Sequence, residues 1–194
     1  MKHLKTLAVI GLILLGAVPL LADLLVGTAD NGALSNGSTD ALCTKFTAIA
    51  TGTATSITAR SGNDFGTSAY TMAVYASDGT HPTGGPRMQS SATTTATTAD
   101  TVYSSNGLTC TVSCAIVTST EYFVCVWSDN GQVELSDAVG AAGQLSISSG
   151  ETHPTWPTWN DATGFAFQFD VGVEGTLAGG GAPAGSMGLM GVGR

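Results

Sequence analysis

The chain has 194 residues, of which 43% are hydrophobic and only 10% are charged, and its formal net charge is −8. This length fits one domain with a sizeable core, and the apolar fraction is too high for a disordered chain. The four basic residues beyond position 22 are scattered rather than clustered. Neither nucleic acid nor an anionic membrane surface is therefore expected as a partner.

Residues 1–22 have the layout of a secretory signal peptide, which we expect to form a helix that ends at Ala22. A basic start with Lys2 and Lys5 precedes an apolar run over residues 6–21. Leu20 is larger than the residue usual at its position before a cleavage site, so an uncleaved N-terminal anchor remains the alternative. Both interpretations predict a secreted or cell-surface protein, and only this segment is expected to meet a membrane.

The first part of the mature chain is predicted to consist of an arm and a pair of strands. Residues 23–41 are polar and rich in Gly and Asn, which is typical of an N-terminal arm with at most one edge strand. The body is predicted to span residues 42–176. Within it, residues 43–50 and 55–60 alternate and are expected to pair through Gly52.

The sequence signals for the next elements, between residues 70 and 117, differ in strength. Residues 70–76 predict a strong strand, and the turn-forming residues 77–86 predict a loop. Residues 87–98 are rich in Ser and Thr and weakly patterned, so an exposed edge strand is expected there. A short strand at residues 101–103 and a hairpin within 108–117 follow.

The strongest strand signal in the chain lies at residues 121–128, which are apolar on both faces. Such a strand is expected at the centre of a packed sheet. Short strands at residues 132–136 and 144–148 come next, and residues 150–161 form a long loop. The closing strand, residues 165–173, alternates over its whole length. Its shared face is expected to carry Phe165, Phe167, Phe169, Val171 and Val173.

This series of short strands and turns predicts an all-β fold, a two-sheet antiparallel β-sandwich of jelly-roll type. No helical periodicity of useful length follows residue 22. Residues 177–194 depart from this pattern, being rich in Gly with several Met and Leu residues. They are interpreted either as a flexible tail or as a docking peptide.

Three stretches carry a resemblance to a known type of module. They are residues 70–79, residues 114–127 and the Trp-Pro loop at 155–159. Together they resemble the jelly-roll-like β-sandwich modules of unknown function in bacterial secreted proteins and phage structural proteins, with Ser119 in place of the usual Gly. The resemblance covers residues 42 to 175 and implies the fold, with a virion as a second setting. It implies no catalytic residues, because such modules serve in binding, adhesion and structure alike.

Four cysteines in an exported chain favour disulfides. Cys110 and Cys114 flank three residues and are expected to close a hairpin loop, while Cys43 and Cys125 lie on strands that can face each other. We therefore favour the pairs 110–114 and 43–125 among the three connectivities, with a free buried Cys125 as the alternative. No metal or other cofactor is predicted, because Cys-x₃-Cys lacks a second close pair.

No sequence motif of a known catalytic site occurs, so we predict that the protein is not an enzyme. The one candidate ligand site is the Trp loop together with nearby polar residues. Aromatic rings beside amides and carboxylates suit sugars. The proposed set is Trp156, Trp159, His153, Asp129, Asn160 and Tyr103. The alternative is that the tryptophans cap an open end of the core.

Two functions follow from these observations. The first is a non-enzymatic β-sandwich that acts in adhesion or in the assembly of an extracellular or virion structure, with other subunits or its own copies as partners. It rests on the export signal, the low charge and the Ser/Thr-rich edge. The second is a carbohydrate-binding module that uses the Trp156 and Trp159 loop.

Overall fold

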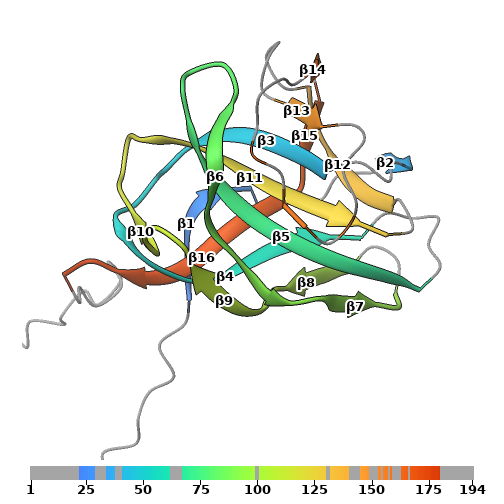
Figure 1. Ribbon diagram of the computed structural model, residues 1–194, viewed down its shortest axis with the longest axis horizontal. Helices are drawn as coiled ribbons and strands as arrows, with labels where there is room; N and C mark the ends of the chain where they lie inside the picture. Colours follow the sequence, from blue (N-terminus) through green and yellow to red (C-terminus); the bar gives the residue numbers. More distant parts are fainter. Residues whose placement is uncertain are drawn as a thin grey trace, which may run out of the picture.

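The protein folds into two principal antiparallel sheets and a small third one (Figure 1). The structure is a computed structural model. It describes residues 22–28, 34–37, 41–61, 67–98, 101–129, 132–139, 145–148, 153, 155, 156, 158, 163–165 and 167–179. The all-β class is confirmed for these residues, which form strands and no helix. The finer jelly-roll assignment stays a prediction.

The strands divide among the sheets as follows. The five-stranded sheet contains β1 (Asp23–Gly27), β16 (Val171–Leu177), β4 (Gly52–Arg60) and β10 (Ala115–Ile116) in that order, with β8 (Val102–Ser104) also paired to β4. The eight-stranded sheet contains β14 (Thr163–Phe165), β13 (Leu145–Ser148), β3 (Ala41–Thr47), β11 (Glu121–Ser128), β5 (Ser68–Ser77), β6 (Pro82–Ala92) and β9 (Asn106–Cys110), with β7 (Thr94–Ala96) paired to β5. The third sheet contains β15 (Phe167–Phe169), β12 (Gln132–Val139) and β2 (Leu34–Gly37).

The main hydrophobic core lies between the two principal sheets. One wall comes from the five-stranded sheet, with Leu25, Ile57 and Val173 fully buried. The other comes from β5 and β11, where Met72 and Val124 are fully buried in the same cluster. Burial of two apolar sheet faces against each other is the main driving force for this architecture.

The predicted central strand is confirmed. Strand β11 pairs with β3 on one side and with β5 on the other, and every residue from Tyr122 to Ser128 is buried. Alternate side chains enter two different clusters. Tyr122, Val124 and Val126 face the main core, whereas Phe123, Cys125 and Trp127 lie on the opposite face of the sheet.

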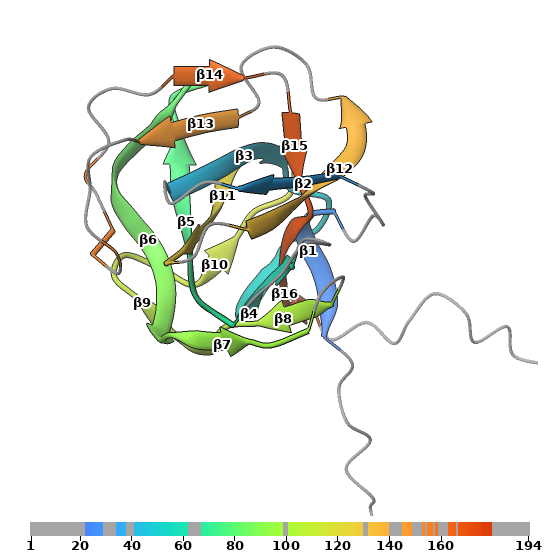
Figure 2. The same ribbon diagram turned by 90° about the vertical axis from the view of Figure 1, so that its right-hand side faces the viewer.

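The single edge strand expected at residues 87–98 is wrong for residues 87–92, which belong to β6, whereas residues 94–96 form a separate strand, β7, that pairs with β5. Strand β6 begins at Pro82 and lies between β5 and β9, and it curves along one side of the molecule (Figure 2). Where β6 diverges from β5, the Ser90 hydroxyl accepts a hydrogen bond from the Met72 N–H at 3.0 Å and donates one to the Met72 carbonyl at 3.3 Å. Ser90 therefore replaces a missing strand partner, a role that weak hydrophobic patterning does not reveal.

The loop expected at residues 77–86 is shorter than predicted. The turn occupies Asp78 to His81, because the Asp78 carboxylate accepts hydrogen bonds from the Thr80 and His81 N–H groups at 2.8 and 2.7 Å. These bonds hold the pKa of Asp78 below its usual value. Gly79 has a φ of 100°, which suits a residue without a Cβ.

Two expected strand pairs are wrong for a shared reason. Strands β3 and β4 belong to different sheets and do not pair with each other, and the same is true of β9 and β10. The short connections at 48–51 and 111–114 therefore cross from one sheet to the other. Neighbouring strands in sequence usually pair, so sequence order alone predicts hairpins here.

The single closing strand expected at 165–173 is also wrong, because this stretch forms β14, β15 and β16 in three sheets. The chain turns at Asp170, whose carboxylate accepts a hydrogen bond from Arg60 Nε at 2.8 Å. Phe169, Val171 and Val173 nevertheless all enter the main core. The alternation continues across the turn because Phe169 on β15 and the two valines on β16 all point into the same core.

The predicted cysteine pairing is confirmed, with disulfides Cys43–Cys125 and Cys110–Cys114. Cys43 and Cys125 are directly opposite on β3 and β11, with their Cα atoms 4.0 Å apart. Loop-closure entropy predicts a stabilisation of about 4.5 kcal/mol for this bond, which spans 82 positions. The same relation gives about 2 kcal/mol for the bond that spans four positions.

The ends of the chain are described only in part. The edge strand expected within residues 23–41 is present as β1, which pairs with β16 and buries Leu25 and Val26, but a second strand, β2, also lies in this stretch and pairs with β12. The signal helix predicted for residues 1–22, apart from Ala22, and residues 180–194 of the tail lie outside the described residues. Within the described ranges, no helix is long and apolar enough to cross a membrane.

Two isoleucines test where the core lies. Ile57 on β4 is fully buried, whereas Ile49 is 65% exposed. We expect Ile57→Ala to lower the free energy of unfolding by about 2–5 kcal/mol, because it removes buried methyl groups and leaves a cavity. Ile49→Ala should change it by no more than about 0.5 kcal/mol. Urea unfolding of both variants measures the difference, and equal losses would contradict this location of the core.

Candidate functional site

The outer face of the eight-stranded sheet carries a second buried cluster, away from the main core. It is built by β3, β5 and β11, whose outward side chains alternate with those of the main core. Its members are Ala41, Cys43, Ala73, Tyr75, Phe123, Cys125 and Trp127, all at most 1% exposed. A sheet face this apolar must be covered, and Trp156 packs against it.

Trp156 and His153 cover one end of this cluster. The Trp156 ring centroid lies 5.6 Å from that of Trp127 and 6.2 Å from that of Tyr75, both in edge-on geometry. The His153 ring meets Trp127 edge-on at 5.4 Å. The structure therefore brings these two residues of the predicted site together, over rings that the sheet presents.

Trp156 lies with its polar atom inward. Its Nε1 is buried and has no hydrogen-bond partner within the part of the chain that the structure describes. The side chain as a whole is half-buried. A buried indole N–H without a partner is costly, so this ring packs chiefly as cover for Tyr75 and Trp127, with an unused donor at its inner edge.

His153 connects the Trp loop to the sheet through polar contacts. Its Nε2 lies 3.3 Å from the hydroxyl of Thr71, a buried residue of β5. Burial lowers the pKa of His153, while the nearby Asp129 carboxylate and a hydrogen bond to the Trp127 backbone oppose that shift. The net effect favours the neutral imidazole at physiological pH.

Asp129 lies at the end of β11, close enough to influence His153 electrostatically. Its Oδ1 accepts a hydrogen bond from the Ala69 N–H at 2.7 Å, and its own N–H donates to the Ala69 carbonyl at 3.2 Å. Asp129 therefore also fastens the end of β11 to β5. The carboxylate has a structural partner, which limits its freedom to bind a ligand.

Tyr103 is not part of this group. It lies on β8, which pairs with β4 in the other principal sheet, and its ring meets Tyr70 at the main core. Its hydroxyl accepts hydrogen bonds from the Thr97 and Thr98 N–H groups at 3.0 and 2.8 Å. This hydroxyl is therefore committed to holding the 97–98 turn, away from the Trp156 cluster.

The remaining predicted residues, Trp159 and Asn160, lie outside the described residues. Thr71, Tyr75 and Trp127 were not predicted as members of this group, because each lies within a strand rather than in or beside the Trp loop. The sequence does contain a signal for them, because they alternate along β5 and β11 with residues that face the main core, and so lie on the opposite face of the sheet. No group of three or more His, Cys, Asp or Glu side chains within the described ranges could hold a metal ion.

Comparisons with known proteins give no further guide. No protein-family model matches the chain, and the searches of curated proteins and of solved structures found no significant match. The chemistry must therefore be judged from the residues themselves.

Acid should destabilise the fold through His153. Because burial lowers its pKa in the folded state, the unfolded chain binds this proton more readily. The free energy of unfolding should fall as the pH drops below about 6.5, the ordinary value for histidine, until the lowered pKa is reached. Urea unfolding between about pH 7.5 and about pH 5 measures this loss.

His153→Gln should remove that part of the pH dependence. His81→Gln is the matched control, because His81 is exposed in the turn after β5, and it should keep the unsubstituted profile. An unchanged profile in the His153→Gln variant would contradict the assignment.

Proposed function

We propose that this chain is a non-enzymatic, exported β-sandwich that acts in adhesion or assembly by binding other protein subunits, further copies of itself included. The observation that carries the proposal is a stretch of chain with almost no charge, which runs from the end of β6 through β7, β8, β9 and β10. Residues 88–120 contain one charged side chain, Asp100.

Strand β9 is the most open part of this stretch. It ends the strand order of the eight-stranded sheet, and four of its five residues are exposed. Exposed edge strands of monomeric proteins usually carry charges that prevent pairing with other chains. The absence of charge from β9 supports a surface that accepts a neighbouring subunit, through its strand edge or its outward face.

Hydroxyl groups add directional contacts to this surface. The Ser91 hydroxyl on β6 and the Thr109 hydroxyl on β9 are exposed and lie 2.6 Å apart. Such a pair can both donate and accept hydrogen bonds to an incoming backbone. The two disulfides add support for an oxidising, extracellular setting, in which they persist.

A charge placed on β9 should prevent assembly. We expect Thr109→Lys to shift the native species toward the monomer, because a lysine there would be desolvated or repelled when a subunit binds. Thr53→Lys is the matched control, since Thr53 is also exposed but lies on β4 between two partners. Light scattering with intact mass measurement gives the size of each species.

A monomeric unsubstituted protein would contradict self-assembly, and equal effects of the two lysines would contradict the assignment of the surface to β9. Removal of residues 23–41 is not a usable test, because β1 would be lost with its buried Leu25 and Val26. Removal of residues 180–194 leaves every described strand intact and tests a contribution of the tail.

Carbohydrate binding remains the second candidate, favoured by one observation. The aromatic cluster at Trp156 includes an indole N–H without a described partner, and a sugar hydroxyl could accept from it if the loop moved. The packing on Tyr75 and Trp127 supports the structural role instead.

Trp156→Ala separates these two roles. We expect the substitution to lower the urea midpoint, because it uncovers the outer cluster, and to leave any binding of a glycan array at the level of the unsubstituted protein. Loss of glycan binding with an unchanged midpoint would favour the carbohydrate-binding function.

A further inference from the structure

The two disulfides lie in opposite environments. Cys43 and Cys125 are fully buried in the outer cluster, under the cover of Trp156. Cys110 is exposed at the end of β9, and Cys114 is half-buried just before β10. The second bond therefore lies between residues at the surface, whereas the first is shielded.

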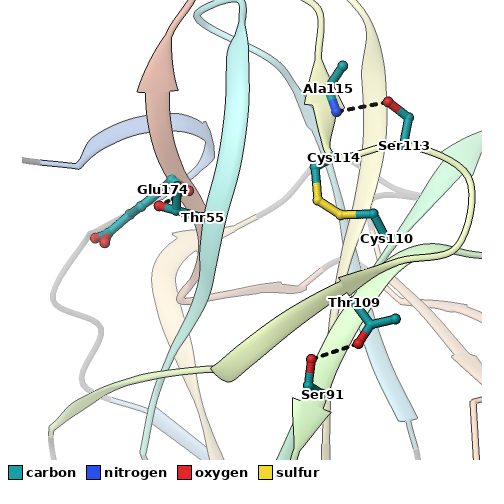
Figure 3. The surroundings of a disulfide bond; sticks show 8 residues. All are labelled: Thr55, Ser91, Thr109, Cys110, Ser113, Cys114, Ala115 and Glu174. Atoms are coloured by element: carbon teal, nitrogen blue, oxygen red, sulfur yellow. Dashed lines mark hydrogen bonds between the residues drawn. A yellow bond between two sulfur atoms is a disulfide. The ribbon is translucent and has the colours of Figure 1, made fainter.

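The Cys110–Cys114 bond joins the two principal sheets. Cys110 ends a strand of the eight-stranded sheet, and Cys114 precedes a strand of the five-stranded sheet (Figure 3). The bond therefore closes the connection between them with a ring of five residues. Reduction would lengthen the covalent path across this boundary without cutting the chain.

Hydrogen bonds hold the same connection independently of the disulfide. The Thr111 and Val112 N–H groups both donate to the Arg87 carbonyl, at 2.9 and 3.0 Å. The Cys114 carbonyl accepts from the Ala54 N–H at 2.9 Å. Because these bonds tie the ring to both sheets, the segment can keep its place when the sulfur–sulfur bond is broken.

We propose that Cys110–Cys114 is a surface site of thiol–disulfide exchange, whose substrate is a small monothiol such as glutathione. The exposed disulfides of proteins are generally the labile ones, and access decides which sulfur is attacked. Cys110 is the more exposed partner, so its Sγ is the electrophile.

The exchange takes place in two steps. The thiolate of the small molecule attacks Cys110 Sγ, the Cys110–Cys114 bond breaks, and Cys114 leaves as a thiolate that takes a proton from water. A second thiolate attacks the small-molecule sulfur of the mixed disulfide and releases Cys110 as a thiolate. The protein gains two electrons, and the two small thiols become one disulfide.

The consequence for the fold is local. Strand β9 keeps its partner β6, but its covalent link to β10 is then only the peptide chain. Local opening of β9 and β10 becomes easier, while the buried Cys43–Cys125 bond still fixes the register of β3 and β11. The site thus gives redox control over one side of the sandwich without global unfolding.

Selective reduction of the full-length native protein tests this proposal. The protein is treated with reduced glutathione in the absence of denaturant, free thiols are alkylated at intervals, and the labelled peptides are identified by mass spectrometry. We expect Cys110 and Cys114 to be labelled at least about 100-fold faster than Cys43 and Cys125, whose reduction requires opening of the structure. The aromatic bands of the near-ultraviolet circular dichroism should stay unchanged, because no aromatic side chain changes its surroundings.

Three outcomes would overturn the proposal: simultaneous labelling of all four cysteines, no labelling before unfolding, or a first glutathione adduct confined to Cys114. A Cys110→Ser/Cys114→Ser double variant is the control and should lose the fast labelling phase entirely. Hydrogen exchange then measures the structural effect. Faster exchange confined to residues 106–116 after reduction supports the local consequence, and faster exchange throughout β3 and β11 contradicts it.

Discussion

Burial of β11 on both faces is the constraint on which the rest of the structure depends. A strand that is apolar on both sides needs cover on both sides, and the sandwich supplies only one. The five-stranded sheet covers Val124 and Val126. The opposite face, with Phe123 and Trp127, is covered by Trp156 from the loop that follows β13. Trp156 therefore serves chiefly as cover for the outer face of the central strands, and any ligand would have to compete with that packing.

The sequence revealed strands better than it revealed their partners. Strands β5 and β11 were predicted closely, because short apolar runs of this kind are stable only as buried strands. For β4 and β10, the sequence did not indicate the correct sheet. Strands of two facing sheets show the same alternation of buried and exposed residues, so the pattern cannot tell one sheet from the other. Strand β6 was mistaken for an edge because its hydrophobic pattern is weak. Part of its contact with β5 is a hydrogen bond from the Met72 N–H to the Ser90 hydroxyl, which a hydrophobic pattern cannot indicate.

The candidate site was predictable to a similar extent. Proximity in sequence placed His153 with Trp156, and the end of β11 placed Asp129 near His153. Tyr103 was misplaced because it follows a crossing between sheets that the sequence does not mark. The rings beneath Trp156 were missed for the opposite reason. They come from strands already assigned to the core, and a strand buried on both faces contributes to two clusters.

The position of the buried disulfide has a consequence for how the protein matures. Cys43 and Cys125 meet only when β3 and β11 are paired in the native register, because a slip of one residue would put the two sulfurs on opposite faces of the sheet. Oxidation therefore selects chains whose central strands are already aligned, and it preserves that alignment afterwards. The presence of the Cys43–Cys125 bond in a molecule therefore indicates that β3 and β11 are paired in the native register.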